Sequence, residues 1–571
     1  MEKYSEKFVT QLIDFLAVHR WIYDVKVTEL FKEQFWDRIP PHWRGPMLHM
    51  TREQLRYMPT GQVESKWPED LISFVADSVE YGLQRHVSDD VVKATVPLDV
   101  SIVRGMSQKK QHEVSRLAGY LMKYCKDCDV VLDIGSGLGY LGQCLAQQCG
   151  ADVIGVECDS YRVDQGNKRH TDMVSSHKST PLHHTSSPQE CHSFVNPGST
   201  KAANNHISLG DEIASKCSCC IGPSHLACDT SSVSMECVNK ETQLSCKCIE
   251  HPHSIDELSL AVPTAKPCGC QPVENNDKHS TCLAKMTRSL QYSAPTRFVI
   301  KQLSLNFSDL CVQQLDDLVK QSIIPGSYHH RLCLVGLHCC GDLSAAVLNY
   351  FIKSSFIGLR SLVLFGCCYH KMSSSMNRDG SGYKIGSQFE FFPLSTTVKD
   401  IINSQSDDRP RFDFNVYAAR LACQETVSRW VSQSDKDHDN HIKHVGYRAM
   451  FEAVVSTEHL VPKNCKQKVD HKQRFECWEN YIGTTLSHYN LTDEHHSSLQ
   501  QKLLEYYRSH HQYLSFIEPF TALQVCLQGV LEHLVMLDRL LYLKEHDLSS
   551  HHKAVFDDCI SPRSVAIISH R

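Results

Sequence analysis

Residues 130–140 read Val-Val-Leu-Asp-Ile-Gly-Ser-Gly-Leu-Gly-Tyr. The apolar residues at the start of this stretch predict a buried strand that ends at Asp133, and three alternating glycines then lead into a helical segment from Leu141. Glycine has no Cβ, so a glycine at each of these turns lets the backbone approach a ligand closely. The order strand, glycine-rich turn, helix is typical of the first crossover of a nucleoside-binding α/β sheet.

A second strand supports this interpretation. Val153-Ile-Gly-Val156 is apolar and ends in Glu157. An acidic residue at the end of the second strand can accept hydrogen bonds from both hydroxyls of a ribose. We therefore expect Asp133 and Glu157 to lie at the same edge of the sheet.

The spacing of the glycines distinguishes between possible ligands. A dinucleotide-binding turn has G-x-G-x-x-G, with a helix N-terminus facing a pyrophosphate. Here Asp133 precedes the glycines, and a carboxylate suits a cationic amino-acid group better than a diphosphate. The pattern resembles motif I of class I S-adenosylmethionine-dependent methyltransferases. That resemblance implies S-adenosyl-L-methionine as the cofactor, with Glu157 at the ribose and the methionine end held at Asp133, Gly135, Ser136, Gly137, Gly139 and Tyr140. A nicotinamide-dependent oxidoreductase is the alternative that Asp133 disfavours.

Composition limits the classes of protein. The 571 residues suffice for more than one domain, and a net charge of −6 excludes a globally basic surface, so any contact with nucleic acid must be local. The N-terminus does not resemble a secretory signal, and Thr521–Leu543, the nearest approach to a membrane span, is interrupted by polar residues. With 27 cysteines in such a chain, we expect reduced thiols rather than a secreted disulfide framework, no membrane insertion, and a cytoplasmic or nuclear location.

Periodicity and composition divide the chain into five parts. These are a helical N-terminal region (1–95), the first part of a Rossmann-like methyltransferase domain (96–170), a low-complexity insertion (171–295), the second part of the domain (296–456) and a helical C-terminal region (457–571). Further strands are expected at 297–303, 331–338 and 361–366, with 446–455 closing the sheet. The resulting fold class is α/β, a doubly wound sheet with helical additions at both ends.

The insertion is rich in Ser, Thr, His and Asn and lacks apolar periodicity, so it is predicted to be disordered. Eleven of the cysteines lie in it, some in C-x-C pairs. Structural zinc sites favour C-x₂₋₄-C pairs, so the sequence predicts no metal ligands there or elsewhere.

Two polar segments follow the fourth and fifth expected strands. His338-Cys-Cys-Gly-Asp342 and Cys367-Cys-Tyr-His370 should share the edge with Asp133, because ligands bind beyond the carboxyl ends of parallel strands. His338 can accept a proton or orient a substrate, and Asp342 can fix His338 or contact the cofactor amine, so these two are the candidate catalytic residues. Cys339, Cys340, Cys367 and Cys368 are candidate nucleophiles, although strand-end cysteines are more often simply packed. Tyr369 can stack on a base, but packing under the edge is the commoner role.

Together these segments resemble the methyltransferase-like protein 25 family. The matching pieces include Met106–Val114, Val131–Gly139, Gly336–Ser344, Gly366–Tyr369 and Leu537–Leu543. The cysteine-rich pieces also resemble elements of a transfer-RNA ribose 2′-O-methyltransferase family. The resemblance implies a methyltransferase with RNA as the leading substrate class and protein as the second. A non-catalytic module that binds cofactor or recruits partners is the alternative, because no complete catalytic set is evident.

Overall fold

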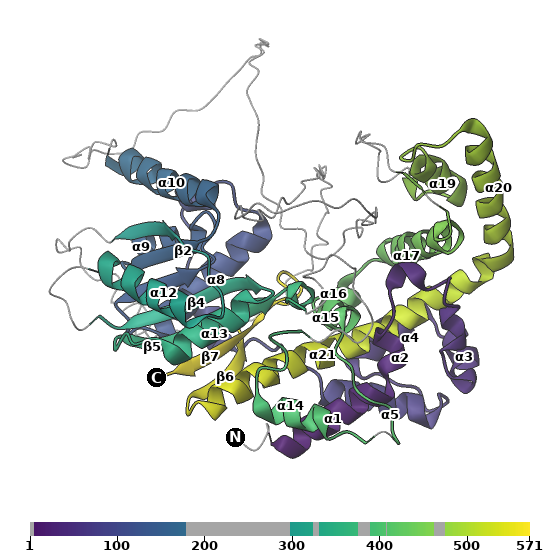
Figure 1. The fold of residues 1–571 in the computed structure, drawn as a ribbon, viewed down its shortest axis with the longest axis horizontal. Coiled ribbons are helices and arrows are strands. Elements are labelled where there is room, and N and C mark those ends of the chain that lie inside the picture. The colour runs from purple at the N-terminus through teal and green to yellow at the C-terminus, as the bar shows by residue number, and fades with distance from the viewer. Residues whose placement is uncertain are drawn as a thin grey trace, which may run out of the picture.

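The computed structural model describes residues 5–178, 297–323, 330–374, 389–406, 408–458, 460–461 and 474–571. A seven-stranded sheet in the order β3-β2-β1-β4-β5-β7-β6 organises one half of the molecule (Figure 1). Its strands are β1 (Val130–Ile134), β2 (Asp152–Glu157), β3 (Phe298–Gln302), β4 (Leu332–Cys340), β5 (Leu359–Cys367), β6 (Ser549–Ala554) and β7 (Val565–His570).

Strands β1 to β5 are parallel, and β7 is antiparallel to both β5 and β6. This is the α/β class I methyltransferase fold that the sequence predicts. The register places Asp133 beside Gly155 of β2 and Val335 of β4, and it pairs Cys340 with Cys367. The carboxyl ends of β1, β2, β4 and β5 therefore form one edge.

Helices cover both faces of the sheet. α8 (Gln108–Tyr124) and α9 (Tyr140–Gln148) pack on one face with residues such as Val114, Leu117 and Leu145. α12 (Asp309–Ser322) and α13 (Leu343–Lys353) pack on the other. α8 begins after Ser107, whose side chain accepts a hydrogen bond from the Lys110 amide and so caps the helix.

Closure of the sheet differs from the prediction. Residues 446–455 belong to α17 (Asp435–Val455), not to a strand, and the sheet is completed by β6 and β7 near the end of the chain. The buried residues of the 446–455 segment, among them Tyr447, Met450 and Phe451, recur at helical spacing, and a Ser434 capping box starts the helix. An apolar run alone did not distinguish helix from strand. β6 (Ser-Ser-His-His-Lys-Ala) escaped prediction because it is a polar edge strand.

A layer of helices forms the other half of the molecule, to the right and below the sheet in Figure 1. Described residues between Val9 and Val75 and between Tyr369 and Leu541 form one hydrophobic core there, including Leu12, Phe35, Trp430 and Leu527. α21 (Ile517–Glu545) is its central helix and ends beside β6. Within the described residues, the helical stretch Asp493–Glu545 is long and apolar enough to cross a membrane, but 89% of its most apolar window is buried inside the protein, as in a core helix.

The remaining helices of eight or more residues are α1 (Glu6–Val18), α3 (Pro41–Leu48), α5 (Glu69–Glu80), α10 (Ser160–Lys178), α14 (Thr396–Asn403), α19 (Trp478–Leu486) and α20 (Asp493–His510). Shorter helices are α2 (Arg20–Tyr23), α4 (Arg52–Tyr57), α6 (Asp89–Lys93), α7 (Val100–Val103), α15 (Val416–Leu421) and α16 (Val427–Ser432). α10 continues through residues 171–178, which were assigned to the insertion, and the rest of the predicted insertion lies outside the described residues.

Candidate active site at the carboxyl edge of the sheet

The glycine-rich loop between β1 and α9 has three left-handed residues. Gly135, Gly137 and Gly139 have φ of 71°, 57° and 73°. A Cβ placed on Gly137 would meet no atom within 4 Å, whereas on Gly139 it would lie 2.5 Å from Phe298 Cζ. Gly137 therefore faces open space where a ligand can approach, and Gly139 is required for packing of the loop against β3.

Glu157 at the end of β2 reaches back over this loop. Its Oε2 accepts a hydrogen bond from the Gly137 amide at 2.9 Å, and its Oε1 accepts from the amides of Cys158 and Asp159. Each carboxylate oxygen has two lone pairs, so Oε2 retains one for a ligand hydroxyl. The side chain is buried and points at the loop, as a ribose-binding acid should.

Asp133 is the buried acid under the loop. It is 3% exposed and makes no hydrogen bond or ion pair with another described residue. Burial raises its pKa to about 7, with Lys110 lowering it and Glu157 raising it further. A buried carboxylate without a partner is costly, and a cationic ligand would supply the missing counter-charge.

Two of the predicted cofactor residues have contacts inside the protein. The Tyr140 hydroxyl donates to the Gly105 carbonyl at 3.0 Å, and the guanidinium of Arg169 covers the tyrosine ring. Ser136 Oγ is buried, and a Cβ on Gly155 would lie 2.8 Å from it. Tyr140 therefore ties the loop to Gly105 and Arg169, whereas Ser136 Oγ has no hydrogen-bond partner among the described residues.

His338 lies at the end of β4 and has a buried acidic partner that the sequence did not reveal. Its Nε2 is 2.9 Å from Oε2 of Glu113 on α8, and Glu113 is completely buried. Glu113 Oε1 accepts a hydrogen bond from Ser561 at 2.7 Å, and Lys110 Nζ lies 3.2 Å from Oε2. No local feature of the sequence indicates that Glu113 faces inward, and only the tertiary fold places it beside His338.

The pair has a defined charge state. Burial favours neutral Glu113, but the hydrogen bond with His338 and the nearby lysines hold the pKa of Glu113 at about 2. Burial likewise opposes the charge on His338, yet hydrogen bonds with Cys367 and Glu113 raise the pKa of His338. A histidine that favours its charged form donates hydrogen bonds, so it suits orientation of a substrate acceptor better than removal of a proton in the free protein.

Asp342 does not contact His338. Its Oδ1 accepts from the Ser373 amide at 2.8 Å, and its Oδ2 accepts from the Ser373 hydroxyl. It therefore fixes the segment that follows β5. Tyr369 is 3% exposed and packs in the helical core, so its ring is not presented to a base.

The candidate cysteines separate into two groups. Cys339 is fully buried, and burial raises the pKa of its thiol. The Sγ atoms of Cys340, Cys367 and Cys368 lie within 4.8 Å of one another. Hydrogen bonds with Cys340 and Cys368 lower the pKa of Cys367, and His338 contributes to the same effect.

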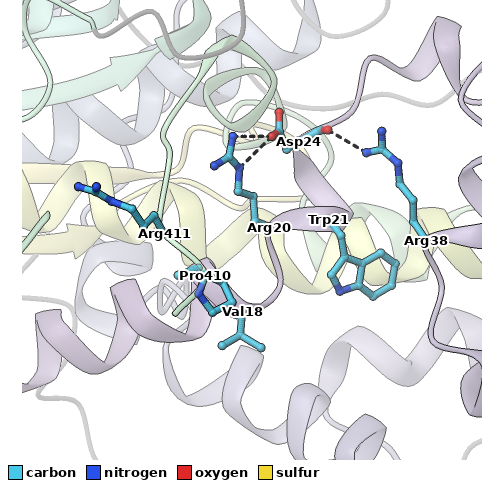
Figure 2. Close-up of a pocket in the computed structure, with 8 residues that line it drawn as sticks. Val18, Arg20, Trp21, Asp24, Arg38, Pro410 and Arg411 are labelled. Carbon is cyan, nitrogen blue, oxygen red and sulfur yellow. Dashed lines mark hydrogen bonds and ion pairs between the residues drawn. The ribbon is translucent and has the colours of Figure 1, made fainter. Parts of the chain in front are cut away.

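Two hollows on the surface lie away from the glycine-rich loop. One of about 360 Å³ lies between α2 and Pro410-Arg411, and Figure 2 shows Arg20 paired with Asp24 and Arg38 bonded to the Asp24 carbonyl. Another of about 480 Å³ is lined by Arg85, Arg116, Asp557 and other residues. Neither includes a residue of the glycine-rich loop, and the guanidiniums of Arg20 and Arg38 already have partners. The chemistry of the carboxyl edge makes it the better candidate site.

Comparison with known proteins agrees with this geometry. Residues 109–375 match a family described as "Methyltransferase domain". A mouse (Mus musculus) protein named "Probable methyltransferase-like protein 25" is 24% identical over 498 residues, covering 82% of this chain and 76% of its own length. The human (Homo sapiens) protein of the same name is 23% identical over 496 residues, covering 82% of this chain and 75% of its own. No solved structure matches. The chain therefore carries a methyltransferase domain over residues 109–375, and along most of its length it is similar to the proteins named methyltransferase-like protein 25.

Proposed function

We propose that the chain transfers a methyl group from S-adenosyl-L-methionine to RNA. The observation that carries the cofactor assignment is the buried carboxylate of Asp133, which has no hydrogen-bond or ion-pair partner among the described residues and lies beneath the open backbone at Gly137. The methionine part of the cofactor carries an ammonium and a sulfonium, which would supply the counter-charge. The lone pair left on Glu157 Oε2 suits a ribose hydroxyl.

The residues present fit this group. Gly137 leaves space for it, Asp133 would face its cationic end, and Glu157 would hold its sugar. When bound, the cofactor supplies an electrophilic methyl group. The chain must align a nucleophile with it and exclude water. His338, fixed by Glu113, is the residue placed to orient an acceptor on the substrate.

RNA is the substrate class we favour, with protein as the alternative outcome. His338–Gly341 and Cys367–Cys368 resemble elements of a transfer-RNA ribose 2′-O-methyltransferase family, and Lys109 and Lys110 lie beside the His338–Glu113 pair. Phosphates are recognised by local positive charge of this kind. Comparative mass spectrometry of modified nucleosides and methylated proteins, with and without the gene, would decide between the two classes. If every nucleoside modification persisted without the gene, RNA would be rejected as the substrate class.

Cofactor binding can be tested with a matched pair of variants. Gly137 and Gly150 both have positive φ, 57° and 69°, and a Cβ on either would meet no atom within 4 Å. Alanine at either position should therefore cost a similar ~1–2 kcal/mol of stability from backbone strain. Only Gly137→Ala would place a methyl group in the proposed crevice.

Calorimetric titration with S-adenosylhomocysteine should show binding by the wild type and Gly150→Ala, and binding at least about tenfold weaker by Gly137→Ala. Equal affinity of the two variants, or no binding by the wild type, would reject the cofactor assignment.

A non-catalytic module would instead keep its cellular function in a His338→Ala, Asp342→Ala double variant. Disappearance of a methyl mark in that double variant, with folding intact, would exclude this alternative.

A further inference from the structure

Three thiols converge at the carboxyl edge of the sheet, beside the proposed crevice. Cys340 and Cys367 are register partners at the ends of β4 and β5, and Cys368 follows directly. Their three Sγ atoms lie within 4.8 Å of one another, and Cys367 Sγ is 3.4 Å from Cys368 Sγ. The separation of 3.4 Å is far beyond the ~2.05 Å of a disulfide. It is close to the ~3.8 Å between sulfurs that share a tetrahedral zinc ion at ~2.3 Å.

The backbone around the cluster is held in an unusual conformation. Cys368 has φ of 46° and His338 has φ of 61°, the left-handed region that L-residues rarely adopt. Within the described residues only Gln34 and Asp547 are other non-glycine residues with positive φ. Such conformations persist where the surrounding structure imposes them, and they concentrate at functional sites. The left-handed residue Cys368 turns the chain directly after β5, next to Cys367 and its register partner Cys340.

The surroundings suit a metal bound by thiolates. His338 interacts with Cys367, and its Nε2 lies 2.9 Å from Oε2 of the buried Glu113 carboxylate. A carboxylate that orients a histidine beside a metal is a common arrangement of outer-sphere groups. Arg563, also buried, supplies positive charge near Cys367. Three thiolates with one divalent ion carry a net charge of −1, which these cations offset.

We propose that Cys340, Cys367 and Cys368 bind a zinc ion through their three sulfur atoms, at the carboxyl edge of the sheet. No ring nitrogen of His338 belongs to the set of atoms within 4.8 Å, so the described residues supply three protein ligands and leave the fourth position open. Three protein ligands and one open position characterise catalytic rather than structural zinc sites. Cys340 is the half-buried member, so the site can be reached from solvent. The inference concerns metal binding and does not depend on the cofactor or the substrate.

The test is the zinc content of the full-length chain, purified under reducing conditions, by inductively coupled plasma mass spectrometry. Cys340→Ser and Cys367→Ser should each lower the zinc content by about one equivalent relative to the wild type. Comparison with the wild type also corrects for any zinc bound by other cysteines. Cys128→Ser is the matched control, since Cys128 is another half-buried thiol with cysteine neighbours, outside the converging set. It should keep the wild-type content. Equal zinc content in all four proteins, or no zinc in the wild type, would overturn the proposal.

A second measurement needs no variant. Alkylation of the zinc-loaded wild type, followed by peptide mass spectrometry, should leave Cys340 protected, and a chelator should expose it while the modification of Cys128 stays constant. Unchanged labelling of Cys340 on chelation would contradict the proposal. A disulfide between any two of the three thiols in the purified, zinc-free protein would do so as well. Failure of cofactor binding with zinc binding intact would reject the proposed function alone.

Discussion

Cofactor affinity should fall as the pH is lowered through 7, because Asp133 must be ionised to receive a cation. Burial raises the pKa of Asp133 to about 7 in the free protein, with Lys110 opposing and Glu157 adding to the effect. A bound ammonium or sulfonium would favour the carboxylate. Binding therefore competes with protonation of Asp133 and releases a proton.

The size of the effect follows from that value. If only the ionised form binds, the apparent dissociation constant scales with 1 + 10^(7−pH), which is about 11 at pH 6 and about 2 at pH 7. Affinity should thus weaken about fivefold, or about 1 kcal/mol, between pH 7 and pH 6. This interval lies below the ordinary pKa of about 7.7–8.0 of an α-amino group, so the cofactor's own amine stays protonated.

Isothermal titration with S-adenosylhomocysteine at pH 6 and 7 measures this change. Repetition in buffers of different ionisation enthalpy at pH 7 should show release of about half a proton. Asp133→Asn should remove both the pH dependence and the proton release. Lys110→Met should move the midpoint upward, because Lys110 lowers the pKa of Asp133. A flat profile in the wild type, or an unchanged slope in Asp133→Asn, would refute the role of this carboxylate.

The same residue links stability to pH. Its folded pKa of about 7 exceeds the ordinary value of 3.8, so ionisation destabilises the fold progressively as the pH rises from about 4 to 7. Asp133→Asn should therefore raise the free energy of unfolding at pH 8, by at most about 4 kcal/mol, and leave it nearly unchanged at pH 4. Urea denaturation at the two pH values measures the difference, and an equal effect at both would contradict the assigned pKa.

Two further substitutions test the packing. Glu532→Ala should lower the free energy of unfolding by about 3–5 kcal/mol. Glu532 Oε2 lies 2.7 Å from Arg563 Nη1, so its removal leaves a buried guanidinium charge uncompensated. A thermal midpoint equal to that of the wild type would contradict this. Gly119→Ala should prevent normal packing of α8, because the added Cβ would lie 1.8 Å from the Ala94 carbonyl oxygen. In Gly483→Ala, in α19, the added Cβ meets no atom within 4 Å, so this substitution should stabilise the fold by about 1 kcal/mol. The thermal midpoints of the two variants should therefore move in opposite directions.

Local sequence signals predicted the sheet well where a strand is apolar and followed by a turn. β1 to β5 all appear close to their expected positions: β1, β2, β4 and β5 are buried parallel strands with near-continuous apolar runs, and the edge strand β3 begins with the apolar run Phe298-Val-Ile300. β6 and β7 were not predicted: β6 is a polar edge strand that lacks this signal, and β7 is a short apolar strand in the C-terminal region, 457–571, that was expected to be helical. The segment 446–455 shows the opposite error: its apolar content predicts a strand, but its buried residues recur at helical spacing and it belongs to α17.

The site was predictable only in part, for a related reason. Asp133 and Glu157 follow their strands directly, so parallel topology alone brings them to one edge. Glu113 is separated from His338 by 225 residues and lies within a polar helical turn, so nothing local indicates their contact. The convergence of Cys340 with Cys367 depends on the β4–β5 register, which the sequence does not specify to one residue.

The boundaries of the matched domain do not define a folding unit. Residues 109–375 contain β1 to β5, but β6 and β7 come from the end of the chain, after α21. Ser561, which hydrogen-bonds Glu113, also lies in this last segment. A fragment ending at residue 375 would expose the β5 edge and remove a partner of the buried acid that fixes His338. The part of the helical layer that follows β5 is therefore enclosed in sequence by strands of the sheet, and α21 carries the chain back to complete the sheet with β6 and β7.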